Sequence, residues 1–196
     1  MPANSMTTAK AILRAAMKAR RAGLDVARRQ SAARAVADIG LGFLGSALPP
    51  NAIIGGFMPI GEEISPLPLM LRLHGLGHRL ALPVMMGKMQ PLEFRSYEPG
   101  DPLTAAVWGI REPGPDKPAV APDVVLTALL AFDDQGYRLG YGGGYYDRTL
   151  QALRAQKGAV TIGLAYDEQR VDAVPHLDYD ERLDWILTPT GARRAL

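Results

Sequence analysis

The sequence predicts an α/β domain of three layers, in which helices cover both faces of a mostly parallel β-sheet. Short apolar runs alternate along the chain with amphipathic segments of helical period, as expected for such a sheet. The chain has 196 residues, of which 47% are hydrophobic, and it shows no internal repeat and no interdomain linker. We therefore expect a single domain over residues 1–196.

Each expected element rests on a local pattern. Asp25 is suited to cap the second helix, and Ser65 followed by Pro66 is typical of the cap and first position of the third. The expected helices are 8–22, 26–44, one beginning at Pro66, and 145–156. The expected strands are 52–57, 78–84, 91–97, 123–131, 159–165 and 184–188, with connections at 99–122 and 133–144.

Composition and charge exclude several classes of protein. The chain has no cysteine, so it has no disulfide, thiolate nucleophile or cysteine-based metal site. It contains no run of 18 apolar residues and begins without a secretory signal, so we expect no membrane partner and a cytoplasmic location. Residues 1–34 hold eight Lys or Arg against one Asp, a net +7. Because the whole chain carries +2, the rest carries −5, and this asymmetry indicates either an anion partner or a solvated helix face.

The most informative segment is the glycine loop, which we define as residues 138–148 (RLGYGGGYYDR). Four of the five residues 140–144 are glycine, so the backbone can adopt positive φ and its N–H groups can converge on an anion. A predicted helix follows, and its N-terminus adds free N–H donors. The loop also follows a predicted buried strand, where open α/β sheets bind ligands. This pattern favours a polyphosphate site, the alternative being a flexible hairpin or a tight crossover.

Known phosphate motifs do not match the glycine loop. A P-loop needs Gly-Lys-Ser/Thr, and this loop contains no lysine. The dinucleotide motif needs a third glycine where Tyr145 stands. Neither Walker-type hydrolysis nor Rossmann-type NAD binding is therefore expected.

Several charged residues are candidates for binding the phosphates or a metal ion. Lys10, Arg14, Lys18 and Arg21 form one basic row on the first helix, which suits an anion or solvent. Arg138 and Arg148 flank the loop and can neutralise phosphate oxygens or face solvent.

Carboxylates add a possible metal site. Asp147, just inside a helix start, suits Mg²⁺ or the helix dipole alone. Glu63 and Asp184 follow or begin strands, where acids are often only loop or turn residues. The three histidines lack metal-ligand spacing, and no Ser-His-Asp set is visible.

The segment 131–148 (AFDDQGYRLGYGGGYYDR) resembles the signature of the 5-formyltetrahydrofolate cyclo-ligase family, also called methenyltetrahydrofolate synthetases. The resemblance covers nearly the whole chain. Its other segments are Lys10-x-x-x-Arg14, FMPIGEEISPLPL (57–69), WGIREP (108–113), IGLAYDEQ (162–169) and LDWILT (183–188).

The resemblance implies a Rossmann-like fold related to the ribose-phosphate isomerase and CoA-transferase group. It also implies ATP-dependent closure of 5-formyltetrahydrofolate to 5,10-methenyltetrahydrofolate, with phosphorylation of the formyl oxygen and release of ADP and phosphate. The implied partners are these small molecules and Mg²⁺, without nucleic acid. The implied ATP contacts are Lys10, Arg14, Arg138, Leu139, Gly140, Tyr141, Gly142, Gly143, Gly144, Tyr145 and Tyr146.

The remaining roles follow from the same resemblance. Met58 and Glu63 would contact folate, and Asp147 and Asp184 would hold Mg²⁺. The expected catalytic residues are Tyr145, Tyr146 and Arg148.

The chain departs from the family pattern at two places. Thr127-Ala128-Leu129 stands where relatives carry a proline, and Ser65 replaces a usual acid, which leaves Glu62 as an alternative to Glu63. Two other functions remain open at this point. A sugar-phosphate isomerase or CoA-transferase-like enzyme would need a carboxylate base but no ATP. A non-catalytic nucleic-acid-binding module would need a larger basic surface than a body of net −5 offers.

Overall fold

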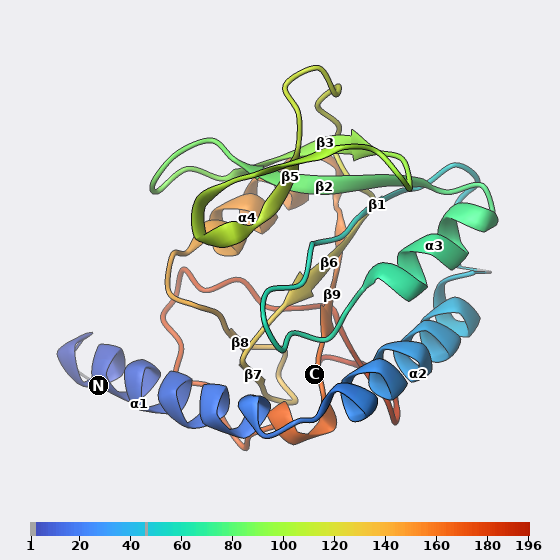
Figure 1. Cartoon of the computed structure of the whole chain (residues 1–196). Coiled ribbons are helices and arrows are strands. Elements are labelled where there is room, and N and C mark those ends of the chain that lie inside the picture. The colour runs from blue at the N-terminus through green and yellow to red at the C-terminus, as the bar shows by residue number, and fades with distance from the viewer. Residues whose placement is uncertain (1–2, 46) are drawn as a thin grey trace.

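The computed structural model describes residues 3–45 and 47–196, and its centre is a seven-stranded sheet between helical layers (Figure 1). The strand order is β3-β2-β1-β6-β9-β10-β11. These strands are β1 (Ile53–Gly55), β2 (Arg79–Met85), β3 (Leu92–Tyr97), β6 (Val124–Ala128), β9 (Val160–Leu164), β10 (Trp185–Thr188) and β11 (Gly191–Arg194). The helices are α1 (Ala3–Ala22), α2 (Val26–Leu44), α3 (Leu67–Gly75) and α4 (Tyr145–Lys157).

The five inner strands are parallel, and the two edge strands are antiparallel to their neighbours. This confirms the predicted mostly parallel sheet. The chain order reverses between β1 and β6, so the connections that leave these two strands diverge. In open α/β sheets the crevice at such a point, outside the carboxyl ends of the strands, is where ligands bind.

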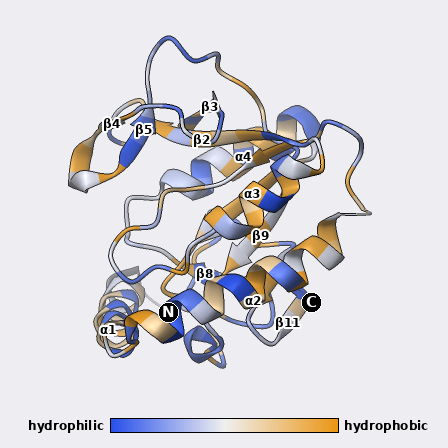
Figure 2. Cartoon of the chain, turned by 45° about the vertical axis from the view of Figure 1, so that its right-hand side comes forward, coloured by the Kyte–Doolittle hydropathy of each residue, from blue (hydrophilic) through white to orange (hydrophobic). Residues whose placement is uncertain are grey.

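Helices cover both faces of the sheet. On one face, α2 and α3 bury Val36, Leu69 and Leu73 against sheet residues such as Leu126 and Ile162. On the other face, α4 buries its apolar stripe. Figure 2 shows α2 and α3 with both apolar and polar residues, as expected for helices with one face in the core. The helix α1 instead packs its Met17 on the segments that follow β6, beyond the carboxyl end of the sheet.

The helix caps agree in part with the sequence. Asp25 caps α2, because its side chain accepts a hydrogen bond from the N–H of Arg28. The prediction for α3 was wrong by one residue, since Pro66 occupies the cap position and Leu67 begins the helix. The side chain of Ser65 still accepts a hydrogen bond of 3.3 Å from the N–H of Leu67.

Other predictions missed short strands. The connection 99–122 contains a hairpin of β4 (Leu103–Ala105) and β5 (Arg111–Pro113) joined by η1 (Val107–Gly109). The expected strand 123–131 divides into β6 and β7 (Ala131–Phe132), because the chain turns to pair with β8 (Arg138–Leu139). A further short helix, η2, spans Asp167–Gln169.

Thr127, in one of the two departures from the family pattern noted above, pairs in a regular ladder with β9. No helix among residues 3–45 and 47–196 is long and apolar enough to cross a membrane.

Candidate active site

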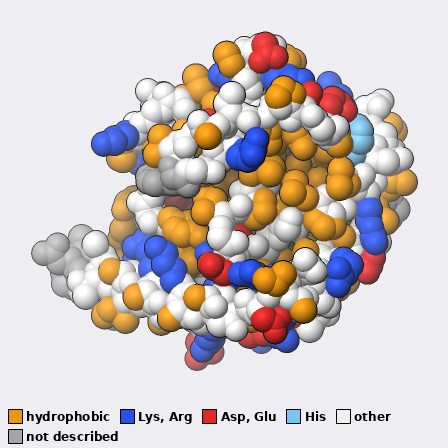
Figure 3. Space-filling model, viewed as in Figure 1, with side chains coloured by type: hydrophobic (Ala, Val, Ile, Leu, Met, Phe, Trp, Pro, Cys, Tyr) orange, Lys and Arg blue, Asp and Glu red, His pale blue; other side chains and the backbone are white. Residues whose placement is uncertain are grey.

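Two loops lie beyond the carboxyl ends of the neighbouring strands β1 and β6. Residues 56–66 follow β1, and the glycine loop follows β6 through the short hairpin of β7 and β8. Helix α1 lies across the same end of the molecule (Figure 1). Figure 3 shows a hollow between α1, at the bottom of this view, and the upper part of the molecule. Lys and Arg side chains gather over α1 at the rim of this hollow. Segments far apart in sequence therefore border one hollow at the switch point of the sheet.

The glycine loop has the backbone expected of an anion-binding loop. Gly142 has φ +103° and Gly144 has φ +64°, so the backbone on both sides of Gly143 adopts the positive φ that these glycines allow. No side chain caps the N-terminus of α4. Among the described residues, the N–H groups of Gly142, Gly143 and Gly144 donate no hydrogen bond. Free donors at a helix N-terminus form a site for phosphate or carboxylate.

Helix α1 contacts this loop through its basic row. Arg14 donates from Nε to the carbonyl oxygen of Gly140 at 2.8 Å. The ammonium of Lys18 lies 5.1 Å from the ring centroid of Tyr141, in cation–π range. Lys10 forms an ion pair with Asp180. The basic side chains on this side of α1 therefore contact other parts of the protein and are not simply solvated.

The two arginines that flank the loop have different surroundings. Arg148 donates from Nη1 to the carbonyl oxygens of Gly143 at 3.1 Å and Gly144 at 2.9 Å, so it holds the loop from the α4 side. Arg138 has a side chain only 5% exposed and forms an ion pair of 2.7 Å with Asp147. Burial lowers the pKa of Arg138, and the charge of Asp147 opposes that shift.

Asp147 points one carboxylate oxygen into the protein. Its Oδ1 accepts from Arg138 and, at 3.2 Å, from the N–H of Glu181. Its side chain is 24% exposed, and no donor among the described residues binds Oδ2. That oxygen is suited to bind a partly hydrated cation.

Asp184 immediately precedes β10, at the amino ends of the parallel strands, opposite to the carboxyl end of β6. Its Oδ2 accepts from the N–H of Thr161 at 2.7 Å and from Arg154 at 3.1 Å. Hydrogen bonds connect it to Asp147 through two intervening residues, Arg154 and Glu181. The structure therefore does not bring the two aspartates together as one ligand pair. No group of three or more His, Cys, Asp or Glu suited to a metal occurs in the described part of the chain.

Glu63 lies beside the tyrosines of the glycine loop. It is 7% exposed, and its Oε2 accepts from the N–H of Ile60 at 2.8 Å. Burial raises the pKa of Glu63, while hydrogen bonds from Ile60 and Tyr141 and the charge of Arg21 oppose the shift. Burial, followed by the charge of Glu63, also raises the pKa of Tyr146. The hydroxyl of Tyr146 thus stays protonated at neutral pH and can donate a hydrogen bond.

Three other residues predicted to contact the ligands, Met58, Leu139 and Tyr145, are partly or wholly packed against the protein itself. Met58, in the loop after β1, is partly buried against the main core. Leu139 has its side chain in the core, and its carbonyl oxygen accepts a hydrogen bond from the N–H of Leu130. The ring of Tyr145 lies over Gly143, where an added Cβ would come within 2.7 Å of ring carbons.

The sequence placed Arg21 in the basic row but gave it no specific contact, and it did not mark Asp180 or Glu181. Arg21 is only 5% exposed and binds the hydroxyl of Tyr141, and two of its buried nitrogens, Nε and Nη1, have no partner. Its place in the basic row of α1 was a usable signal. The two acids follow an irregular segment, and no pattern in the sequence marks them.

The fold and the site define an α/β protein with an anion-binding glycine loop at the switch point of its sheet. Comparison with known families gives the identity of this class. The chain belongs to the 5-formyltetrahydrofolate cyclo-ligase family, whose model matches residues 6–189. This confirms the resemblance carried by the glycine loop.

Named relatives agree with the family assignment. The chain is 35% identical over 188 residues to a 5-formyltetrahydrofolate cyclo-ligase of Mycolicibacterium smegmatis, covering 92% of this chain and 93% of the relative. It is 37% identical over 139 residues to the Escherichia coli K12 protein of that name, covering 68% and 76%.

A solved 5,10-methenyltetrahydrofolate synthetase of Aquifex aeolicus superposes with a TM-score of 0.76 at 27% identity, covering 95% of this chain and 92% of that one. A Mycoplasma pneumoniae synthetase at 22% identity has the same fold, with a TM-score of 0.74 over 92% of this chain and 98% of that one.

Proposed function

We propose that the chain uses ATP to close 5-formyltetrahydrofolate to 5,10-methenyltetrahydrofolate, releasing ADP and phosphate. The observation that carries this proposal is the convergence of an anion-binding loop and a buried carboxylate. Gly142 and Gly144 leave N–H groups free, while Tyr141 reaches Glu63 across the site. A phosphate donor and a polar heterocycle can therefore meet at one place.

The nucleotide is assigned to the glycine loop and to α1. The free N–H groups face the phosphates, with Arg14 and Arg148 close enough to the loop to stabilise negative charge. Lys10 must exchange its partner Asp180 for a phosphate oxygen if it binds ATP itself. Arg138 is assigned a supporting role rather than a phosphate contact, because its guanidinium already donates to Asp147 and to the carbonyl oxygen of Glu181.

Mg²⁺ is assigned to Asp147, because its side chain is partly exposed and its Oδ2, which has no donor among the described residues, suits a cation that keeps most of its waters. Bound there, the ion would neutralise charge on the phosphates. The family resemblance also points to Asp184, whose carboxylate would have to give up Thr161 or Arg154 to bind metal.

The chemistry needs no nucleophile from the protein. The formyl oxygen attacks the γ-phosphorus of ATP, and ADP leaves. N10 of the folate then attacks the activated carbon, and the phosphate departs with the formyl oxygen and the N10 proton. The residues of the loop position the groups and stabilise charge. Tyr146 donates a hydrogen bond rather than acting as a base, because its pKa is raised.

Folate is assigned to Met58 and Glu63, with the rings of Tyr145 and Tyr146 bordering it. Glu63 is preferred to Glu62 because it lies beside Tyr141. The buried carboxylate also suits the alternative, an isomerase of the related ribose-phosphate isomerase group, which would proceed without ATP. We expect the reaction to take place in the cytoplasm, with no nucleic-acid partner.

The experiment is to follow the absorbance of the methenyl product with 5-formyltetrahydrofolate as substrate. We expect product only when ATP and a divalent cation are both present, with one ADP formed per product. Turnover that continues after EDTA treatment without ATP would contradict the mechanism. No turnover under any condition would contradict the proposed function.

A further inference from the structure

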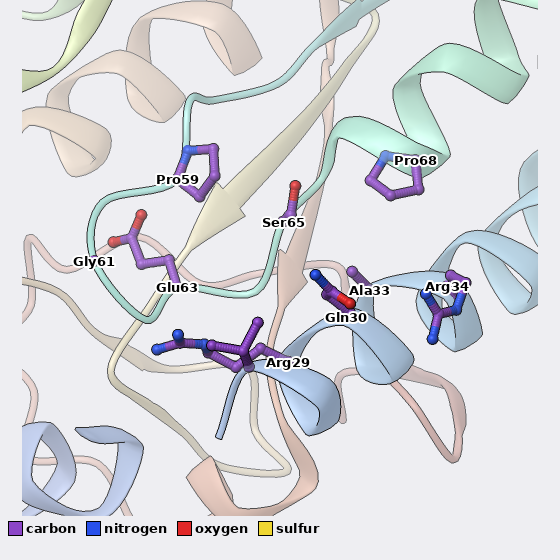
Figure 4. Close-up of a pocket in the computed structure, with 10 residues that line it drawn as sticks. Arg29, Gln30, Ala33, Arg34, Pro59, Gly61, Glu63, Ser65 and Pro68 are labelled. Atoms are coloured by element: carbon purple, nitrogen blue, oxygen red, sulfur yellow. The ribbon is translucent and has the colours of Figure 1, made fainter. Parts of the chain in front are cut away.

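A pocket of about 360 Å³ lies between the start of α2 and the loop after β1 (Figure 4). Its volume lies in the range of small-molecule sites. Arg29, Gln30 and Arg34 of α2 line one side, and Glu63 and Pro68 lie on the other. Nothing in the proposed handling of ATP uses this pocket.

The pocket continues from the proposed folate site, because Glu63 borders both. In Figure 4, Glu63 lies at one end with the charged end of Arg29 beneath its loop, and Arg34 lies at the far end beside Pro68. A ligand whose heterocycle contacts Glu63 therefore has this pocket as its neighbouring space.

The pocket holds two cationic side chains without protein partners. Among the described residues, the guanidinium groups of Arg29 and Arg34 form no hydrogen bond or ion pair, whereas Arg28 on the same helix is paired with Glu168. The carboxylate within the pocket, Glu63, is already bound by the N–H of Ile60 and by Tyr141. The pocket thus has an excess of positive charge that an anionic ligand can neutralise.

The walls between the arginines are largely apolar. Ala33 is 5% exposed, and Pro59 and Pro68 stand opposite it. Val26 borders the same pocket. An apolar channel with cations at its ends suits a ligand with an aromatic body and a carboxylate tail.

We propose that this pocket binds the benzoylglutamate part of the folate, with Arg29 and Arg34 as partners for its carboxylates. The inference rests on the proposed function, since that function supplies a substrate with a glutamate tail. Gln30 lies between the two arginines and points toward Ser65, so it is placed to bind an amide of the same tail. The pocket then decides the preference for glutamylated over unglutamylated folates.

The test compares Arg29→Gln and Arg34→Gln with wild type on two substrates. One is 5-formyltetrahydrofolate, and the other is the corresponding pteroate, which lacks glutamate. With the glutamyl substrate we expect each change to raise KM roughly fivefold to tenfold, as for a partly exposed charged pair. The values of kcat and of KM for ATP should not change. With the pteroate, wild type and variants should have equal KM.

Arg28→Gln is the matched control on the same helix, and we expect it to leave both KM values unchanged. Isothermal calorimetry with 5-formyltetrahydrofolate gives a second reading of affinity. An active wild type with unchanged KM in both variants would overturn this inference alone. An equal rise in KM on the pteroate would also overturn it, because the arginines would then act without the tail. A wild type that neither binds nor converts the folate would overturn the proposed function as well.

Discussion

Arg138 and Asp147 form an ion pair of 2.7 Å at the base of the glycine loop, with the arginine side chain only 5% exposed. The pair joins β8, at the start of the loop, to the first turn of α4, at its end. Asp147 therefore has two separable duties, since Oδ1 holds the arginine and Oδ2 is open to a cation. The helix dipole alone does not account for this arrangement.

Asp147→Asn should lower both stability and turnover. Removing the charge leaves Arg138 buried without an ionic partner, which costs about 1–3 kcal/mol. It also removes the oxygen proposed for Mg²⁺, so turnover should fall by orders of magnitude and recover in part at high Mg²⁺. Urea unfolding and the dependence of rate on Mg²⁺ give the two readings. A loss of stability with normal catalysis would leave Asp147 as a structural residue.

Asp184→Asn is the comparison for this prediction. Its carboxylate accepts hydrogen bonds from Thr161 and Arg154, so the change should lower stability. The Mg²⁺ dependence of the rate should stay as in wild type. A higher Mg²⁺ requirement in this variant would instead support the role implied by the family resemblance.

Gly143→Ala should disturb the loop through Tyr145. The new methyl would come within 2.7 Å of the tyrosine ring, so the ring must move. We expect KM for ATP to rise several-fold with a stability loss of about 1 kcal/mol or less. Gly140→Ala meets no protein atom within 4 Å and so measures crowding of the ligand alone. Equal and small effects of both changes in steady-state kinetics would show that Tyr145 does not position ATP.

Arg14→Ala should weaken ATP binding roughly tenfold, because a charged hydrogen-bonding group beside the phosphates is lost. Its bond to Gly140 also fixes α1 against the loop. Arg20→Ala is the control, since Arg20 binds the carbonyl of Glu168 away from the loop. Calorimetric titration with ATP would contradict the assignment if both variants bound as wild type does.

Glu63→Gln should change how stability depends on pH. Burial raises the pKa of Glu63, so the folded state holds its proton more tightly than the unfolded state does. Stability is then greatest below the unfolded pKa and falls as pH rises through the folded pKa. The glutamine variant lacks this loss, so its stability relative to wild type should improve from pH 4 to pH 7. Urea unfolding at the two pH values checks this, and a constant difference would contradict it.

The sequence predicted the parallel sheet and the long helices because their patterns are local. Alternating apolar runs and the cap at Asp25 depend on nearby residues, and both were confirmed. The hairpin of β4 and β5 was missed because β4 has no buried residue and the buried residues of β5 are Glu112 and Pro113, which do not form an apolar pattern. The glycine-rich sequence indicated that the loop could adopt positive φ, and the structure shows this at Gly142 and Gly144.

The partners of the site residues were not predictable in the same way. Lys10 meets Asp180 across 170 positions of sequence, and Arg138 meets the carbonyl of Glu181. Such contacts depend on how the irregular segment after η2 folds back over α4, which no periodicity encodes. The pocket beside Arg29 depends on the same kind of long-range placement, since it forms between α2 and the loop after β1.

Isotope transfer from the formyl group to phosphate decides whether ATP activates the formyl oxygen. The substrate is 5-formyltetrahydrofolate labelled with ¹⁸O at that oxygen, and the released phosphate is examined by mass spectrometry. We predict one ¹⁸O atom in each phosphate, because the formyl oxygen leaves bonded to the transferred phosphorus. Unlabelled phosphate, with the label released to water, would contradict the mechanism.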